Sequence, residues 1–111
     1  MQLLEQTYER TRQPGLLEQM AELAQRAGDD DLALRYWQRL IEAAGLTPAR
    51  AVRVATLLLL RARTDEALAL LERAREEARP TDVAFWRLTA ELAQATQKDT
   101  TAIDAYRHVV D

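Results

Sequence analysis

The chain repeats itself at intervals of 34 and 35 residues, and this period restricts its fold more than any other feature. Each repeat contains an alanine followed by a branched aliphatic residue at i+1 and by apolar residues at i+4 and i+7. The three sets are Ala33, Leu34, Trp37 and Leu40; Ala67, Leu68, Leu71 and Ala74; and Ala102, Ile103, Tyr106 and Val109. This spacing places each set on one face of a helix.

A second amphipathic stretch precedes each of these predicted helices, and it follows the same period. Its apolar positions are Leu17, Met20, Ala21 and Ala24; Ala51, Val54, Ala55 and Leu58; and Trp86, Thr89, Ala90 and Ala93. The third residue of every set is alanine, which lets two helices approach closely, as an antiparallel helical hairpin requires. Pro14, Pro48 and Pro80 lie where one helix pair ends and the next begins, because proline is tolerated only in the first turn of a helix.

The pattern therefore predicts a chain of helices with short connections. The expected helices are 2–12, 15–27, 30–44, 48–62, 65–78, 82–96 and 100–110. We expect three residues at equivalent positions to be N-caps, because their side-chain oxygens can accept bonds from the free amides of a first turn. These residues are Asp30, Thr64 and Asp99.

Residues 14–111 resemble the tetratricopeptide repeat family in this period and in several signature positions. Trp86 falls on the family's tryptophan position and Gly28 on its turn glycine. The family's signature alanine and aromatic positions are matched by Ala33, Ala67 and Ala102 and by Trp37 and Tyr106. Ala62 and Gln97 depart from the motif, since they replace the turn glycine. The resemblance implies an all-α fold of helix-turn-helix repeats stacked in a right-handed solenoid, an α-α superhelix.

We interpret residues 1–111 as a single fragment of such an array. Its expected parts are 2–12, the second helix of a preceding repeat; 14–47, a repeat; 48–82, a repeat; and 83–111, a truncated repeat. Val109 and Val110 are still apolar at the end of the last helix, whereas a solenoid normally closes with a polar capping helix. This is why we expect a fragment of a longer array.

Composition excludes several classes of function. The chain has 15 Lys and Arg residues against 18 Asp and Glu, a net charge of −3, and the basic residues are dispersed, which argues against a nucleic-acid partner. It contains no cysteine or serine, so disulfides and the commonest nucleophiles are absent. The longest apolar run, 54–60, is far shorter than the roughly 20 residues of a membrane-spanning helix. We expect no membrane insertion of this segment.

No residue pattern predicts a catalytic, metal or cofactor site. His108 is the only histidine, and without a second nitrogen or sulfur ligand it suits the end of a helix better than a metal. The run 29–31 consists of aspartates but lacks the spacing of a calcium loop. Trp37 and Trp86 could stack on a sugar, but both occupy core positions of the repeat.

The remaining surface is the inner, concave face, to which the resemblance assigns the first helix of each repeat. In this register it would present Glu18, Glu22, Gln25, Val52, Arg53, Thr56, Leu59, Arg87, Glu91 and Gln94. Chaperone-binding members of the family hold a peptide carboxylate at such positions with lysine, asparagine and arginine. Here Glu18, Glu22 and Glu91 would repel a carboxylate, which argues against a co-chaperone role.

The predicted function is a non-enzymatic scaffold for protein–protein interaction. The segment 26–37 also resembles the periplasmic repeat regions of bacterial exopolysaccharide-export outer-membrane proteins, of the Pel system in particular. That resemblance implies a periplasmic location and a partner that modifies the polymer, a polysaccharide deacetylase or hydrolase. The alternative is a cytoplasmic adaptor in a regulatory or assembly pathway. Direct polysaccharide binding is less favoured, because few aromatic residues are expected at the surface.

Overall fold

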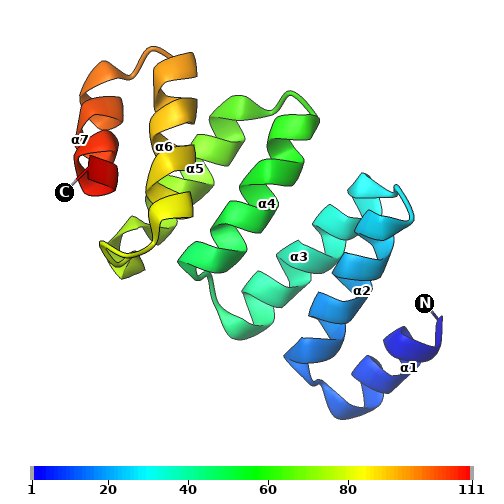
Figure 1. Cartoon of the computed structure of the whole chain (residues 1–111). Helices are drawn as coiled ribbons and strands as arrows, with labels where there is room; N and C mark the ends of the chain where they lie inside the picture. The colour runs from blue at the N-terminus through cyan, green and yellow to red at the C-terminus, as the bar shows by residue number, and fades with distance from the viewer. Residues whose placement is uncertain (1, 111) are drawn as a thin grey trace. The chain divides into compact units, whose positions relative to one another are not determined.

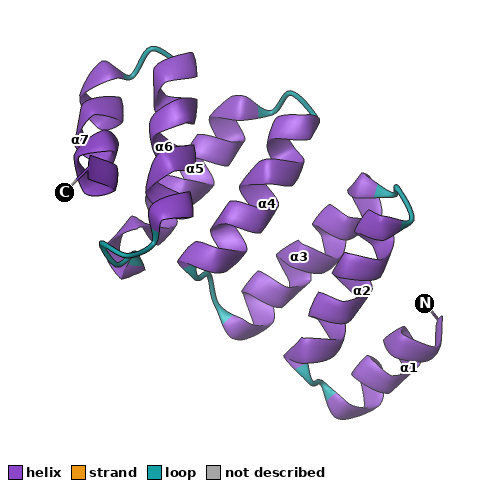
Figure 2. Ribbon diagram, in the orientation of Figure 1, coloured by secondary structure: helices purple, strands orange, loops and turns teal. Residues whose placement is uncertain are grey.

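The computed structural model describes residues 2–110, and Met1 and Asp111 lie outside it. Within this range every regular element is helical and there is no strand, as Figure 2 shows. The chain forms two compact units, Met1–Leu46 and Thr47–Asp111. The predicted all-α class with helix-turn-helix repeats is therefore confirmed, while the division of 1–111 into one array and its repeats stays a prediction.

The first unit contains α1 (Gln2–Thr11), α2 (Pro14–Arg26) and α3 (Asp30–Ala44), and α2 and α3 form a helical hairpin (Figure 1). Both predicted apolar sets of this hairpin are buried. They are Leu17, Met20, Ala21 and Ala24 on α2, and Ala33, Leu34, Trp37 and Leu40 on α3. Helix α1 packs against α2 and buries Tyr8.

The second unit contains two hairpins, α4 (Pro48–Leu60) with α5 (Thr64–Ala74), and α6 (Val83–Ala95) with α7 (Asp99–Val110). Helix α6 also packs against α4 and α5 (Figure 1). The predicted apolar sets of α4, α5 and α6 are all buried. They are Ala51, Val54, Ala55 and Leu58; Ala67, Leu68, Leu71 and Ala74; and Trp86, Thr89, Ala90 and Ala93.

The apolar set of α7 behaves differently from the sets of α3 and α5. Ala102 is buried, but Ile103 is 57% exposed and Tyr106 is 38% exposed. The equivalent residues of α5 are fully buried, and α5 packs against α6 as well as α4. Helix α7 is the last helix that the structure describes, and it packs mainly against α6.

The predicted N-caps Asp30, Thr64 and Asp99 are wrong by one residue, since each is the first residue of its helix. The carbonyls that accept the first helical bonds belong to Asp29, Arg63 and Lys98, the residues just before them. Only Asp29 also caps with its side chain, which accepts a bond from the Leu32 amide at 3.1 Å.

The shift arises because one residue before each cap adopts a left-handed conformation that ends the preceding helix. These residues are Gly28, Ala62 and Gln97, with φ of +80°, +59° and +62°. After each of them the chain doubles back, so that the amides of Asp29, Arg63 and Lys98 bond to carbonyls five residues earlier, at 2.8–2.9 Å. A single cap residue is then enough to start the next helix.

Helix α5 ends earlier than the predicted range 65–78, and a 3₁₀ turn, η1 (Arg75–Glu77), follows it. The link from η1 to α6 is held by bonds to Arg79. Its carbonyl accepts a bond from Trp86 Nε1 at 2.9 Å, and its amide donates to the Asp82 carboxylate at 2.7 Å. These two bonds tie the link after η1 to the start of α6.

Trp86 joins three parts of the second unit. It is 3% exposed, meets Phe85 edge to face with the ring centres 5.1 Å apart, and stacks on His108 of α7 at 3.8 Å. The Arg75 guanidinium lies 5.5 Å from the centre of its ring, and Arg75 forms an ion pair with Asp104 of α7. His108 is therefore a packing partner of the core tryptophan as well as a residue of the last helical turn.

Tyr36 links α3 to α1 in the first unit. It is 3% exposed, and its hydroxyl donates a hydrogen bond to the Glu5 carboxylate. Burial, followed by the bond to Glu5 and the charge of Glu5, raises the pKa of Tyr36 from 10.0 to about 12.

We expect the substitutions Ala62→Gly and Gln97→Gly each to stabilise the protein by about 0.5–1 kcal/mol. A left-handed conformation costs a residue with a side chain about 1–2 kcal/mol, and the greater freedom of glycine in the unfolded chain offsets part of the gain. Urea denaturation followed by circular dichroism measures the change. Gly28→Ala is the reverse control and should destabilise. A loss of stability in both glycine variants would show that these turns are not strained.

The Tyr36–Glu5 contact predicts a loss of stability at high pH. The folded state holds the Tyr36 proton more tightly than the unfolded state, so the contribution of Tyr36 to the free energy of unfolding should stay constant below pH 10 and fall between pH 10 and 12. Tyr36→Phe cannot titrate and should lack this part of the fall. Parallel urea titrations of the two proteins at several pH values give the difference, and parallel curves would refute the raised pKa.

Trp86→Ala should destabilise the protein by about 3–5 kcal/mol, because it empties a buried space and removes the bond to the Arg79 carbonyl. Ile103→Ala, at an exposed apolar position, is the control and should change stability by about 0.5 kcal/mol or less. Circular dichroism during urea denaturation would measure both. A loss under about 1 kcal/mol for Trp86→Ala would contradict its place in the core.

Candidate functional site

The predicted inner-face residues of the first unit lie along one side of α2. Glu18, Glu22 and Gln25 are separated by four and three residues, so they follow one another up the helix. All three are half-buried, whereas the packing residues on the other side, such as Leu17 and Ala21, are completely buried. The prediction that these three side chains reach the surface is consistent with this burial.

In the second unit the predicted residues lie on α4 and α6, two helices that pack against each other. Helix α4 carries Val52, Arg53, Thr56 and Leu59, and helix α6 carries Arg87, Glu91 and Gln94. None of the seven is buried, and only Val52 is half-buried. The structure therefore brings these residues onto two neighbouring helices of one unit. Whether Glu18, Glu22 and Gln25 of the first unit continue the same face stays a prediction.

Two of these residues form bonds that limit what they offer a partner. The Thr56 hydroxyl donates to the carbonyl of Val52 at 2.8 Å, one turn earlier in the same helix. The side-chain oxygen of Gln94 accepts a bond from the Tyr106 hydroxyl of α7 at 3.1 Å. The Gln94 side chain is therefore already engaged by α7.

The structure also contains a groove that the sequence analysis missed. It has a volume of about 470 Å³ and lies where α4 and α6 begin. Its lining is Pro48, Ala49, Val52, Thr81, Asp82, Val83, Ala84 and Phe85. Val52 alone was predicted to belong to a binding face. The one available signal was Val83, an apolar residue in the first turn of a predicted helix but outside its apolar set.

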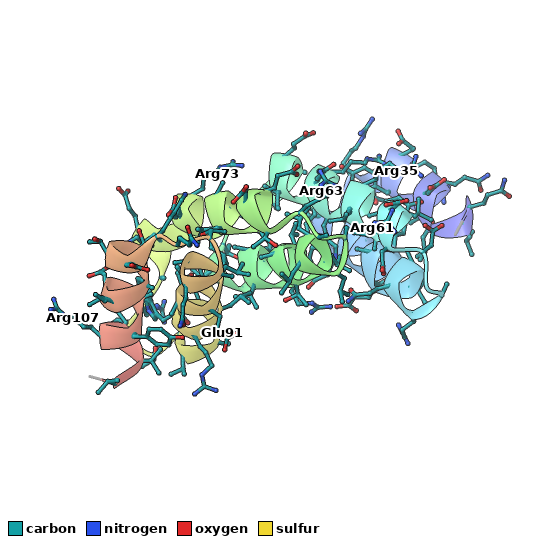
Figure 3. All side chains as sticks on the ribbon, turned by 90° about the horizontal axis from the view of Figure 1, so that it is seen from above. Arg35, Arg61, Arg63, Arg73, Glu91 and Arg107 are labelled. Atoms are coloured by element: carbon teal, nitrogen blue, oxygen red, sulfur yellow. The ribbon has the colours of Figure 1, made fainter. Side chains whose placement is uncertain are left out.

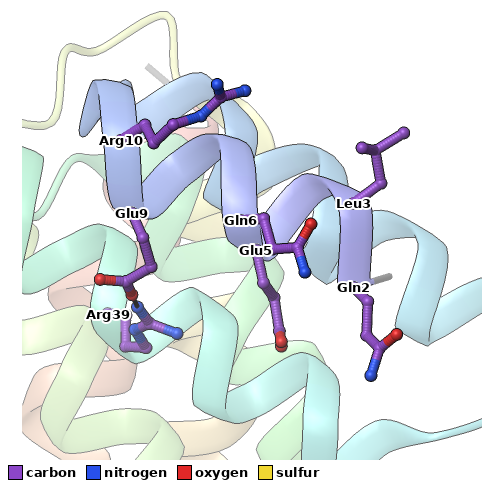
Figure 4. Close-up of a pocket in the computed structure, with 7 residues that line it drawn as sticks. All are labelled: Gln2, Leu3, Glu5, Gln6, Glu9, Arg10 and Arg39. Carbon is purple, nitrogen blue, oxygen red and sulfur yellow. Dashed lines mark hydrogen bonds and ion pairs between the residues drawn. The ribbon is translucent and has the colours of Figure 1, made fainter.

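A second hollow, of about 790 Å³, lies in the first unit beside α1, and its lining is mostly polar. Figure 4 shows that Glu9 and Arg39 meet there, in an ion pair of 3.4 Å, while Leu3 and Arg10 point away from Arg39. Both members of the pair are well exposed, so the pair is screened by water. Most residues that line this hollow are polar or charged, whereas most residues that line the groove at the start of α4 and α6 are apolar.

The described residues 2–110 hold no group of three or more His, Asp or Glu side chains that could bind a metal ion. In the same range, no helix is long and apolar enough to span a membrane. Trp37 and Trp86 are 1% and 3% exposed, so neither presents an open ring face on which a sugar could stack.

Comparison with known proteins identifies the family to which this chain belongs. A family model described as Tetratricopeptide repeat matches residues 39–111, which include the last part of α3 and the whole second unit. No curated protein matches the chain. The matched segment is well over half of the chain, and it contains the two hairpins of the second unit, whose apolar sets are 35 residues apart. The chain therefore belongs to the tetratricopeptide repeat family.

Proposed function

We propose that this protein is a non-enzymatic scaffold that binds a partner protein through the inner face formed by α4 and α6. Tetratricopeptide repeats in general are protein-interaction modules and not catalysts, and the family match supports a protein partner. We choose this face because the side chains of Arg53, Arg87 and Glu91 are exposed on two adjacent helices. Their neighbours Val54, Ala55 and Ala90 are buried and serve packing instead.

This face has a mixed charge. Arg53 and Arg87 are basic and Glu91 is acidic, and all three side chains are exposed. Exposed charges of this kind contribute mainly to the rate and specificity of association, because they attract a surface of complementary charge and repel a wrong one. A partner should therefore carry acidic residues opposite the two arginines.

A more specific proposal concerns the cellular location of the protein and the system in which it works. The protein is a periplasmic segment of an exopolysaccharide export system of the Pel type, whose parent is anchored in the outer membrane. There it recruits a polysaccharide deacetylase or hydrolase to the export porin and so acts in biofilm formation. The support for this proposal is the resemblance of residues 26–37 to such periplasmic repeat regions. A cytoplasmic location would contradict it and favour an adaptor role in regulation or assembly.

Reversing two charges on the inner face should weaken partner binding. We expect Arg53→Glu with Arg87→Glu to reduce the binding free energy by about 1–3 kcal/mol, since attraction becomes repulsion. Isothermal titration with the polysaccharide deacetylase or hydrolase of the same export system measures the effect, and circular dichroism checks that helicity is unchanged.

The matched control reverses two arginines elsewhere on the same unit, Arg73→Glu with Arg107→Glu. Their side chains extend outward from α5 and α7 (Figure 3). Arg75 is unsuitable as a control, because it pairs with Asp104 and lies over Trp86. Loss of binding in the control pair with normal binding in the inner pair would place the partner on the outer helices. No binding of either enzyme to the unmodified protein would contradict the export proposal.

A further inference from the structure

The groove at the start of α4 and α6 has a mostly apolar surface. Both Phe85 and Val83 line it, and Phe85 is 2% exposed whereas Val83 is 42% exposed and offers an apolar surface to water. Its volume of about 470 Å³ falls within the range of about 300–1,000 Å³ that is typical of ligand pockets. It therefore has room for one large apolar side chain.

Two arginines lie next to the groove, and one aspartate is part of its lining. Arg53 follows Ala49 by one helical turn, and Arg87 follows Val83 by one turn, so each arginine rises from the same side of its helix as a groove residue. The acidic residue in the lining, Asp82, already accepts a bond from the Arg79 amide at 2.7 Å. A ligand side chain in the groove would thus have two guanidinium groups within about one turn of it.

The direction of the two helices also favours a negatively charged ligand. Both α4 and α6 begin at the groove, Pro48 being the first residue of one helix and Val83 the first of the other. The amino end of a helix carries a partial positive charge. Apolar lining, two flanking arginines and two positive helix ends favour an acidic ligand with an apolar side chain and disfavour a basic one.

We propose that this groove binds a peptide segment of the partner protein in which one leucine-sized or aromatic side chain lies beside aspartate or glutamate residues. The apolar side chain fills the space above Phe85 between Ala49 and Val83. The neighbouring carboxylates face Arg53 and Arg87. This inference rests on the proposed protein-binding function and names the kind of segment that the inner face recognises.

The test uses a fluorescein-labelled peptide, Gly-Ser-Asp-Glu-Leu-Glu-Asp-Ser-Gly, and fluorescence anisotropy with the complete chain. Replacing the leucine by alanine should weaken binding about ten-fold, because most of the buried apolar surface is lost. Replacing the four acidic residues by lysine should abolish measurable binding. These two comparisons use the unmodified protein and do not depend on the folding of any variant.

Two protein variants place a carboxylate in the groove, Ala49→Asp and Val83→Asp. An acidic residue in the first turn of a helix favours the helix, so both variants should fold. Each should weaken binding of the acidic peptide about ten-fold or more. The introduced carboxylate would lie against the apolar side chain of the peptide, and it would repel the peptide's own carboxylates. Thr100→Asp adds the same charge to the first turn of α7, away from the groove, and should leave binding unchanged.

Several outcomes would overturn the inference. With the unmodified protein, these are equal binding of the leucine and alanine peptides, binding of the lysine peptide that is equal to or tighter than that of the acidic peptide, and no binding of any peptide. With the variants, the contradicting outcome is that Val83→Asp and Thr100→Asp lose the same amount of affinity for the acidic peptide. A concentration-dependent dimer in analytical ultracentrifugation that Val83→Asp abolishes would mean that the groove holds a second copy of the chain. If the partner enzyme still binds in a way that depends on Arg53 and Arg87, only the groove proposal fails and the scaffold proposal stands.

Discussion

The close approach of paired helices, made possible by small residues at fixed positions, is the constraint on which the whole structure depends. In each hairpin the first helix carries a buried alanine, Ala21, Ala55 or Ala90, and the second carries Ala33, Ala67 or Ala102. A larger side chain at these positions would push the helices apart and unpack the leucines around them. The bulky residues Trp37 and Trp86 are buried too, one in each unit. Packing of alanine against larger residues, more than charge, therefore holds each hairpin together.

Periodicity predicted the helices and most of the core, because the burial of a helix face depends on spacing that can be read directly from the chain. The N-caps were misplaced by one residue, although Gly28, Ala62 and Gln97 align with the family's turn glycine, because the apolar period does not give the backbone conformation of each turn residue. The early end of α5 was also missed. The apolar period encodes neither the 3₁₀ turn that follows α5 nor the bond from the Trp86 indole to the Arg79 carbonyl, a contact across seven residues.

The candidate site was predictable only in part. Arg87 and Glu91 are exposed on α6 and Thr56 is exposed on α4, and their part in a binding face stays a prediction. The groove was not predictable, because its walls come from the starts of two helices that are 35 residues apart and from the link before α6. Its apolar character arises from Ala49 and Val83, which lie outside the repeating packing positions. In a repeat protein such off-register residues are free to vary without loss of the fold, and binding specificity can therefore reside in them.

The chain has two tryptophans, and each unit buries one, Trp37 in the first and Trp86 in the second. Each indole is therefore a fluorescent reporter of the unit around it. With the other tryptophan replaced by phenylalanine, the emission of the remaining one follows the exposure of a single core. Coincident denaturation curves of the two single-tryptophan proteins would mean that the units unfold as one cooperative body, and separate curves would mean that each unit unfolds independently. The even distribution of large aromatic residues thus allows the cooperativity between repeats to be measured without an added label.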